Sequence, residues 1–162
     1  MYLGELARLA IFDAIDKEVL SLPKEVFGKK RIFDTRHISE IESDRINTFQ
    51  NLDGVLIELG VNIDSVTDFD RKILRYICTC VSFRAANLAG AGVAALANKI
   101  GRPRLTVGMD GSVYKFHPCF GRIMKAVARR LTSDNIDFDV VLAEDGSGRG
   151  AALAVAAAVT KR

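Results

Sequence analysis

The sequence has 162 residues, 49% hydrophobic and 27% charged, which fits one ordinary globular domain and excludes a disordered, collagen-like or coiled-coil chain. The net charge of +3 is too small to indicate a nucleic-acid surface by itself, so no nucleic-acid partner is expected. The longest apolar run, residues 151–159, is about half of what a bilayer crossing needs, so no membrane span is expected either.

The three cysteines predict free thiols in a reducing compartment, because the sequence starts without a recognisable secretory segment. A cytoplasmic location is therefore expected. Cys78 and Cys80 form a C-x-C pair, which is one pattern of metal ligands. Because both histidines lie far away in the sequence and no second cysteine pair exists, the pair is interpreted as buried thiols and no metal site is predicted.

An amphipathic helix is predicted over Tyr2–Leu20, because Leu3, Leu6 and Ala10 recur on one face with charged residues between them. No capping residue precedes this pattern, as expected for a chain cut inside a larger protein. Residues 21–33 contain a proline, a glycine and several lysines, and this composition predicts a surface loop.

A capping box predicts where the second helix begins. Ser39 and Glu42 have the required spacing, and the apolar pattern continues to about Leu59. Gly60 is expected to end this helix, since glycine readily adopts the left-handed conformation that closes helices.

A third and longer helix is predicted from Thr67 to about Ile100. Thr67 and Asp70 again have capping-box spacing, and apolar residues then recur every three or four positions. Small residues crowd the second half around Gly90, which predicts close packing against another backbone. The expected buried face consists of Ile73, Ile77, Val81, Ala85 and Leu88.

The last third of the sequence alternates between strand and helix patterns, which predicts an α/β architecture with much helix and little sheet. Two or three strands are few for so long a chain, and this suggests that the rest of a sheet is encoded elsewhere. The predicted elements are a strand at Arg104–Met109, a turn at Asp110–Gly111, a return strand at Ser112–Phe116, a helix at Phe120–Leu131, a strand at Ile136–Leu142 and a helix at Gly150–Val159.

Two glycine-containing loops follow the predicted strands, at the strand ends where open α/β sheets bind ligands. In Gly108–Lys115, glycine permits a positive φ and Ser112 can donate a hydrogen bond to phosphate. A simple hairpin turn is the alternative interpretation. The second loop, Glu144–Ala151, leads directly into a helix whose free N–H groups suit phosphate.

The second loop also satisfies a relaxed dinucleotide fingerprint, Gly146-x-Gly148-x-x-Ala151. The strand and the acidic residue that should follow such a fingerprint are absent from the sequence, so we disfavour dinucleotide binding. The loop is not a P-loop either, because the Lys-Ser/Thr pair does not follow it.

Two further features have ordinary explanations. Arg122, Lys125 and Arg129 share a helix face, which suits a nucleic-acid stripe or, as we favour, a solvated face without an aromatic platform. His117, directly before Pro118, could serve as a general base, but at a helix start it is more simply a local hydrogen-bonding group.

Five sequence blocks resemble eukaryotic hexokinases and glucokinase and occur in the same order as in that family. The match spans essentially the whole chain, and five ordered blocks are far more specific than any single glycine motif. The blocks are Met1–Glu5, Phe33–Arg36, Glu42–Asp44, Val107–Pro118 and Glu144–Leu153.

The resemblance implies a partial actin-like ATPase fold of the ribonuclease H-like type, helix-rich with a small sheet. Residues 1–162 would form one C-terminal segment of the large lobe, on its adenosine-binding side, with the small lobe absent. The implied activity is ATP-dependent phosphorylation of a hexose such as glucose at its 6-hydroxyl, the first step of glycolysis. ATP with Mg²⁺ is the implied cofactor, and hexose and hexose 6-phosphate are partners of the complete enzyme.

The resemblance also implies two sets of site residues. The first matches family positions that contact ATP, and the second matches positions that hold the phosphate of glucose 6-phosphate in animal hexokinases. The ATP set is Met1, Thr35, Ser39, Gly111, Ser112, Val113, Tyr114, Lys115 and Phe116, and the glucose 6-phosphate set is Asp110, Gly111, Ser112 and Ser147.

The family's catalytic aspartate, its hexose-binding side chains and its first two phosphate motifs lie upstream of Met1 in this pattern. No catalytic residue is therefore expected in this chain, and negligible catalysis is expected from it alone. The alternative is a non-catalytic module that binds nucleotide or sugar phosphate and acts through protein contacts. Apolar surface around Leu3, Leu6 and Gly90 is expected to be exposed, and a homo-oligomer would cover it.

Overall fold

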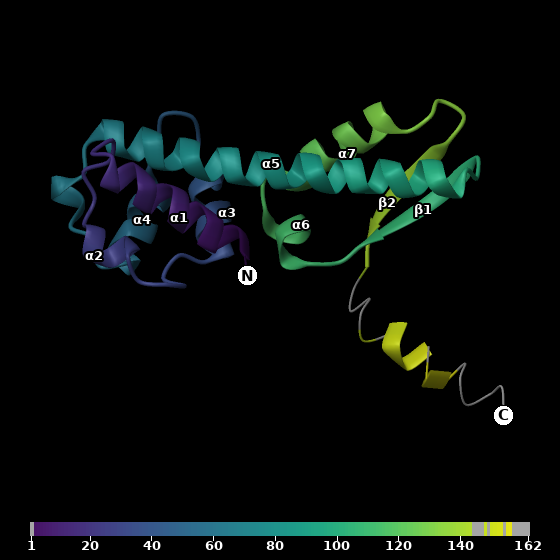
Figure 1. The fold of residues 1–162 in the computed structure, drawn as a ribbon, viewed down its shortest axis with the longest axis horizontal. Helices are drawn as coiled ribbons and strands as arrows, with labels where there is room; N and C mark the ends of the chain where they lie inside the picture. The colour runs from purple at the N-terminus through teal and green to yellow at the C-terminus, as the bar shows by residue number, and fades with distance from the viewer. Residues whose placement is uncertain (1, 144–147, 149, 154, 157–162) are drawn as a thin grey trace.

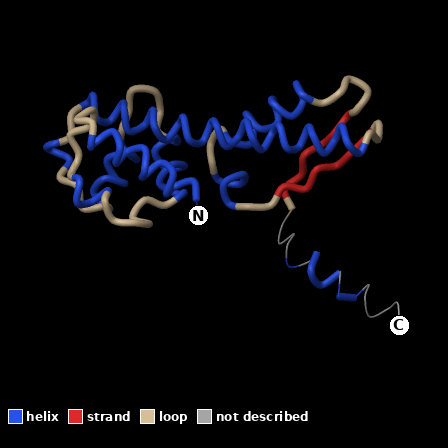
Figure 2. Tube along the Cα trace, in the orientation of Figure 1, coloured by secondary structure: helices blue, strands red, loops and turns tan. Residues whose placement is uncertain are grey.

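The computed structural model describes residues 2–143, 148, 150–153, 155 and 156. Helix α5 (Asp68–Ile100) runs along the molecule for ~50 Å (Figures 1 and 2). The N-terminal helices pack along its first half, and α7 and the sheet lie along its second half. The other elements are α1 (Tyr2–Asp16), α2 (Lys24–Phe27), α3 (Thr35–Ser43), α4 (Gln50–Glu58), the 3₁₀ helix η1 (Ile63–Ser65), β1 (Arg104–Met109), α6 (Ser112–Phe116), α7 (Phe120–Leu131) and β2 (Asp137–Leu142).

Helix α5 begins and ends where the sequence predicts. Asp70 and Thr67 form the capping box, and Gly101 closes the helix with a φ of 65°. The Asp70 carboxylate also accepts a hydrogen bond from the Ser21 backbone N–H at 2.8 Å, which fastens the α1–α2 connection to the start of α5. Burial alone would raise the pKa of Asp70, but these hydrogen bonds outweigh it and hold the pKa below its ordinary value.

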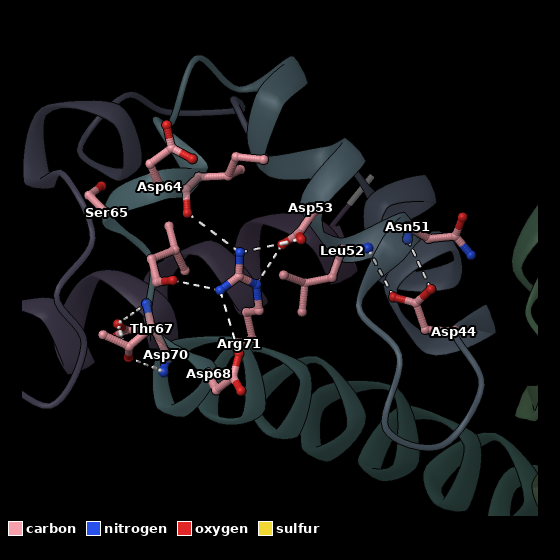
Figure 3. Close-up of polar contacts among 12 residues, drawn as sticks. Asp44, Asn51, Leu52, Asp53, Asp64, Ser65, Thr67, Asp68, Asp70 and Arg71 are labelled. Atoms are coloured by element: carbon pink, nitrogen blue, oxygen red, sulfur yellow. Dashed lines mark hydrogen bonds and ion pairs between the residues drawn. The ribbon is translucent and has the colours of Figure 1, made fainter.

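Arg71, in the first turn of α5, joins this helix to α4 and to the segment between them (Figure 3). Its guanidinium donates to the Asp53 carboxylate at 2.7 Å and to the Val66 carbonyl at 2.5 Å. The hydrogen bond to the Asp53 carboxylate is the main cause of the raised pKa of Arg71. The N-terminal helices therefore share both an apolar core and a polar anchor with α5.

The buried face of α5 lies one row away from the predicted one. The side chains in closest contact are smaller than expected, while Ile73, Ile77 and Val81 are half-buried beside them and Leu88 is exposed. Small side chains in this row allow the axes of neighbouring helices to approach α5 more closely. This row is Leu74, Cys78, Ser82, Ala86, Gly90, Ala94 and Ala97.

Gly90 is the point where α5 and α7 come nearest. A Cβ built there would lie 2.6 Å from the Met124 carbonyl oxygen and 2.8 Å from the Val127 Cβ. The predicted close approach of another backbone is therefore confirmed. The expectation that this face is exposed is wrong, because α7 covers it.

Helix α1 is shorter than predicted and buries a different face. Leu6 and Ala10 are exposed, and the buried residues are instead Gly4, Ala7, Arg8 and Ile11. The Arg8 side chain reaches the core because Glu5 and the Phe27 carbonyl accept its hydrogen bonds. The same hydrogen bond from Arg8 lowers the pKa of the Glu5 carboxyl to about 2.

The segment 21–33 is not the surface loop that its composition predicts. It contains α2 and buries Leu22, Phe27 and Phe33 in the N-terminal core. Its lysines lie on the outside, and the apolar residues between them supply the burial that keeps the segment attached.

The predicted helix over 39–59 is in fact two helices. Helix α3 already begins at Thr35, where the Asp34 backbone N–H donates to Nδ1 of His37 at 2.9 Å. Helix α3 ends before Asp44. The Asp44 carboxylate accepts hydrogen bonds from the backbone N–H groups of Asn51 and Leu52, and these bonds cap the start of α4 (Figure 3). Gly60 closes α4 with a φ of 81°, as predicted.

Strands β1 and β2 form a two-stranded parallel sheet, in register from Arg104 opposite Asp137 to Met109 opposite Leu142. Both strands are as predicted to within one residue, but the return strand at Ser112–Phe116 is wrong, because this segment is α6. Parallel partners need a crossover, and α6 and α7 supply it. In the last predicted helix, Gly150–Val159, the described residues are helical and the others lie outside the described part.

Helix α5 is the one described helix that is long and apolar enough, by length and composition, to cross a membrane. This is weak evidence for a membrane span, because the core helix of a soluble protein passes the same test. Helices α1, α3 and α7 all pack against α5, which gives its apolar face a partner within the fold.

Candidate functional site

A cleft of about 380 Å³ opens between α3 and α6. Thr35 and Ser39 lie one turn apart on α3, so both face the cleft from the same side. Five of the residues implied to contact ATP thus meet here, although they come from segments far apart in the sequence. The lining residues are Thr35, Arg36, Ser39, Glu40, Ser43, Ser112, Val113 and Phe116.

The cleft offers hydroxyl groups beside an apolar wall. Val113 and the largely exposed Phe116 ring supply that wall, and the serine and threonine side chains supply both donors and acceptors. The Gly4 backbone N–H donates to the Thr35 hydroxyl oxygen at 3.3 Å, which places the start of α1 directly beside the cleft. This combination suits a planar ring with a polar ribose attached to it.

A second hollow of about 450 Å³ lies on the other side of α6, at the carboxyl ends of the strands. Gly111 leads into α6 with a φ of 126°, a conformation that favours glycine, and Ser112 and Phe116 line both hollows. The Ala143 N–H donates to the Met109 carbonyl at 2.8 Å, so the carboxyl ends of β1 and β2 lie side by side. The second hollow is lined by Asp110, Gly111, Ser112, Lys115, Phe116, Leu142 and Ala143.

Charged side chains at the cleft are already paired. Arg36 donates to Glu40 at 3.3 Å and more closely to Glu58, and these carboxylates, Glu58 foremost, raise its pKa. In the second hollow, the Lys115 ammonium lies 5.4 Å from the centroid of the Phe116 ring. Arg36 and Glu40 were missed by sequence reasoning; their spacing of four residues places them beside each other on α3, on a face adjacent to that of Thr35 and Ser39.

Among the described residues of the implied sets, Tyr114 is the one that lines neither hollow. Tyr114 faces α7 instead, where its ring packs on Gly121 and the Lys125 ammonium lies 5.9 Å from its centroid. Met1 and Ser147 lie outside the described residues.

The other candidate groups have structural roles. Nδ1 of His117 accepts backbone hydrogen bonds from Cys119 and Phe120, so the expected local hydrogen bonding is confirmed. Arg122 and Arg129 are exposed, as expected of a solvated face, whereas Lys125 is half-buried. No group of three or more potential metal ligands occurs among the described side chains.

The prediction of buried thiols is right for one cysteine of the C-x-C pair and wrong for the other. Cys78 is buried, and this burial raises the pKa of its thiol. Cys80 is exposed, because two positions along a helix turn a side chain to the opposite side.

Comparisons with known proteins give one consistent result. The family model described as hexokinase matches residues 1–157. The chain is 39% identical over 165 residues to hexokinase from Schistosoma mansoni, covering 100% of this chain and 36% of that protein. It is 42% identical over 171 residues to human hexokinase-1, covering 100% of this chain and 18% of that protein.

The solved structure of Schistosoma mansoni hexokinase complexed with glucose matches with a TM-score of 0.86 at 39% identity, over 94% of this chain and 34% of that one. The chain thus spans about a third or less of the length of these relatives. The predicted fold class, a helix-rich part of the actin-like sugar kinase fold with a small sheet, is confirmed. Family model, sequence identity and fold agree over nearly the whole chain, which belongs to the hexokinase family.

Proposed function

We propose that this chain is the nucleotide-binding part of an ATP-dependent hexokinase, in which the γ-phosphoryl group of ATP passes to the 6-hydroxyl of a hexose. The observation that carries this proposal is the cleft between α3 and α6, where Thr35 and Ser39 face Ser112, Val113 and Phe116. The resemblance implies all five of these residues, and they come from two segments that are far apart in the sequence.

In this arrangement the adenosine occupies the cleft between α3 and α6. The Phe116 ring and Val113 cover the base, while the hydroxyls of Thr35 and Ser39 orient the ribose. The phosphate chain extends past Ser112 towards the second hollow, where the Lys115 ammonium offsets its charge.

The residues present fit a magnesium ion that is carried by the nucleotide. Mg²⁺ in such sites is held by substrate phosphates and one or two carboxylates. Asp110 is the carboxylate that lines the second hollow. Mg²⁺ would neutralise phosphate charge there, and Asp110 would position it.

Asp110, Gly111 and Ser112 would also receive the phosphate of a hexose 6-phosphate, since they line the same hollow. The side chains that bind the hexose and accept its proton belong to other parts of a hexokinase, so the 162 residues alone act as a large-lobe segment without turnover. The relative solved with glucose supports a hexose substrate. The three free thiols support a cytoplasmic location, which cell fractionation tests.

Calorimetric titration of the purified chain with MgATP tests nucleotide binding. Ser112→Ala should weaken binding about fivefold, because one hydrogen bond contributes ~1 kcal/mol. Ser65→Ala, in η1 far from the cleft, is the matched control. Equal affinities of the two variants would contradict the proposed contact.

A coupled glucose phosphorylation assay tests the division of labour. We expect no turnover from the 162-residue chain, and measurable turnover would show that the reacting groups lie within it. Binding of glucose 6-phosphate without any binding of MgATP would instead favour the non-catalytic alternative.

A further inference from the structure

Three buried polar side chains meet directly behind the cleft. The Ser82 hydroxyl on α5 donates to Oε1 of Glu42 on α3 at 2.5 Å. Nε2 of His117, the residue that follows α6, lies 3.4 Å from the same oxygen. The side chains of Glu42 and His117 are 8% and 1% exposed. Polar groups buried this deeply cost free energy unless they find partners.

The backbone around His117 determines which ring nitrogen carries the proton. Nδ1 accepts the N–H groups of Cys119 at 3.2 Å and Phe120 at 3.1 Å, so it has no proton of its own. The proton is therefore on Nε2, on the side of the ring that faces Glu42. Among the described residues buried Nε2 makes no hydrogen bond, and its polar contact is the Glu42 oxygen at 3.4 Å.

The position of this contact relates it to the cleft. Glu42 directly precedes Ser43, which lines the wall formed by α3, and His117 directly follows Phe116, which lines the opposite wall. Helix α6 has five residues and none of them is buried, so its own side chains contribute little to holding it in place. The Glu42–His117 contact ties its end to α3.

We propose that Glu42 and His117 are positioning residues of the nucleotide cleft. The Nε2 proton of His117 and the Glu42 carboxylate hold α6 at a set distance from α3, and Ser82 orients the carboxylate. The role in nucleotide binding rests on the proposed function. The tie between the two helices rests on geometry alone.

Two substitutions at His117 separate this role from its role at the start of α7. His117→Asn places an amide oxygen near the position of Nδ1 and keeps the backbone cap, but it removes the group that faces Glu42. His117→Gln places its amide near Nε2, where it donates to Glu42, but it loses the cap.

We expect His117→Asn to weaken MgATP binding about tenfold, the effect of losing one polar contact to a buried carboxylate, while its melting temperature stays close to that of the wild type. We expect His117→Gln to retain most of the affinity while melting lower. Asp70→Asn, at the far end of α5, is the control for lost stability and should keep wild-type affinity. The reverse order of affinities between the two His117 variants would overturn the proposal.

Nitrogen NMR of the imidazole groups tests the Glu42–His117 contact in the absence of nucleotide. The sequence has only two histidines, and His37 is an internal control because its Nε2 faces Glu58 rather than Glu42. Glu42→Gln should shift the Nε2–H signal of His117 and leave that of His37 in place. An unshifted His117 signal would overturn the tie. Failure of the wild type to bind MgATP would overturn the proposed function and the positioning role, while the NMR result would still decide on the tie.

Discussion

Replacement of Gly90 by alanine is expected to destabilise the protein although alanine is the better helix former. The added Cβ would lie 2.6 Å from the Met124 carbonyl oxygen, which belongs to the backbone of α7 and cannot rotate away. Helix α7 would have to move from α5. Gly92, two residues further on, has open space around its Cβ position and provides the matched control.

The two substitutions share one helix and one change of propensity, so their difference isolates the contact. Glycine to alanine in a helix interior gains up to ~1 kcal/mol. Gly92→Ala should therefore stabilise the protein by about that amount. Gly90→Ala gains the same propensity but forces an overpacked contact that costs about 1–3 kcal/mol, towards the upper end because the obstacle is backbone.

Urea unfolding followed by circular dichroism measures both free energies of unfolding under the same conditions. We expect Gly90→Ala to be less stable than Gly92→Ala by about 2–3 kcal/mol. Equal stabilities, with equal dependence on urea concentration, would show that α5 and α7 do not approach as closely as the structure has them.

Three further predictions follow from single groups. Asp70 has a lowered pKa in the folded state, so its carboxylate stabilises the fold above its ordinary pKa of ~4, and this effect is lost as the pH falls through the lowered value. Asp70→Asn should therefore cost stability at neutral pH and progressively less as the pH falls below ~4, as unfolding measured across this range would show. Iodoacetamide followed by mass spectrometry should label exposed Cys80 first and buried Cys78 only after unfolding, and early labelling of Cys78 would contradict its burial. Gly111→Ala should weaken MgATP binding, because a φ of 126° is strained for alanine and the substitution would distort the start of α6, although the space around the added Cβ is open. Unchanged affinity would argue against the start of α6 as part of the site.

The parts of the fold that the sequence predicts are those with a strong local cause. The Thr67–Asp70 capping box and Gly101 fix both ends of α5, and the helix at Phe120–Leu131 is predicted to the residue. Where two local signals compete, the prediction fails. Ser39 and Glu42 have capping-box spacing, but α3 begins four residues earlier, where Asp34 and His37 hydrogen-bond.

Features that depend on distant partners could not be predicted from local patterns. The local pattern of Ser112–Phe116 is that of a return strand. In the structure β2 occupies the position beside β1, so this segment is part of the crossover between the two strands. For the same reason, the candidate site needed the family resemblance to bring Thr35 and Ser39 together with Ser112. The Glu42–His117 contact joins two residues whose local patterns give no indication that they meet.

The parallel pair of strands has a consequence for how this chain behaves in solution. Each strand uses one side for its partner, and within the described residues the other side of each keeps a row of backbone donors and acceptors without a neighbouring strand. Such rows recruit further strands, from the same polypeptide or from another copy. At high concentration the sheet is therefore the place where copies should begin to join edge to edge, and a lysine introduced into a strand, at Thr106 or Val141, should delay that association.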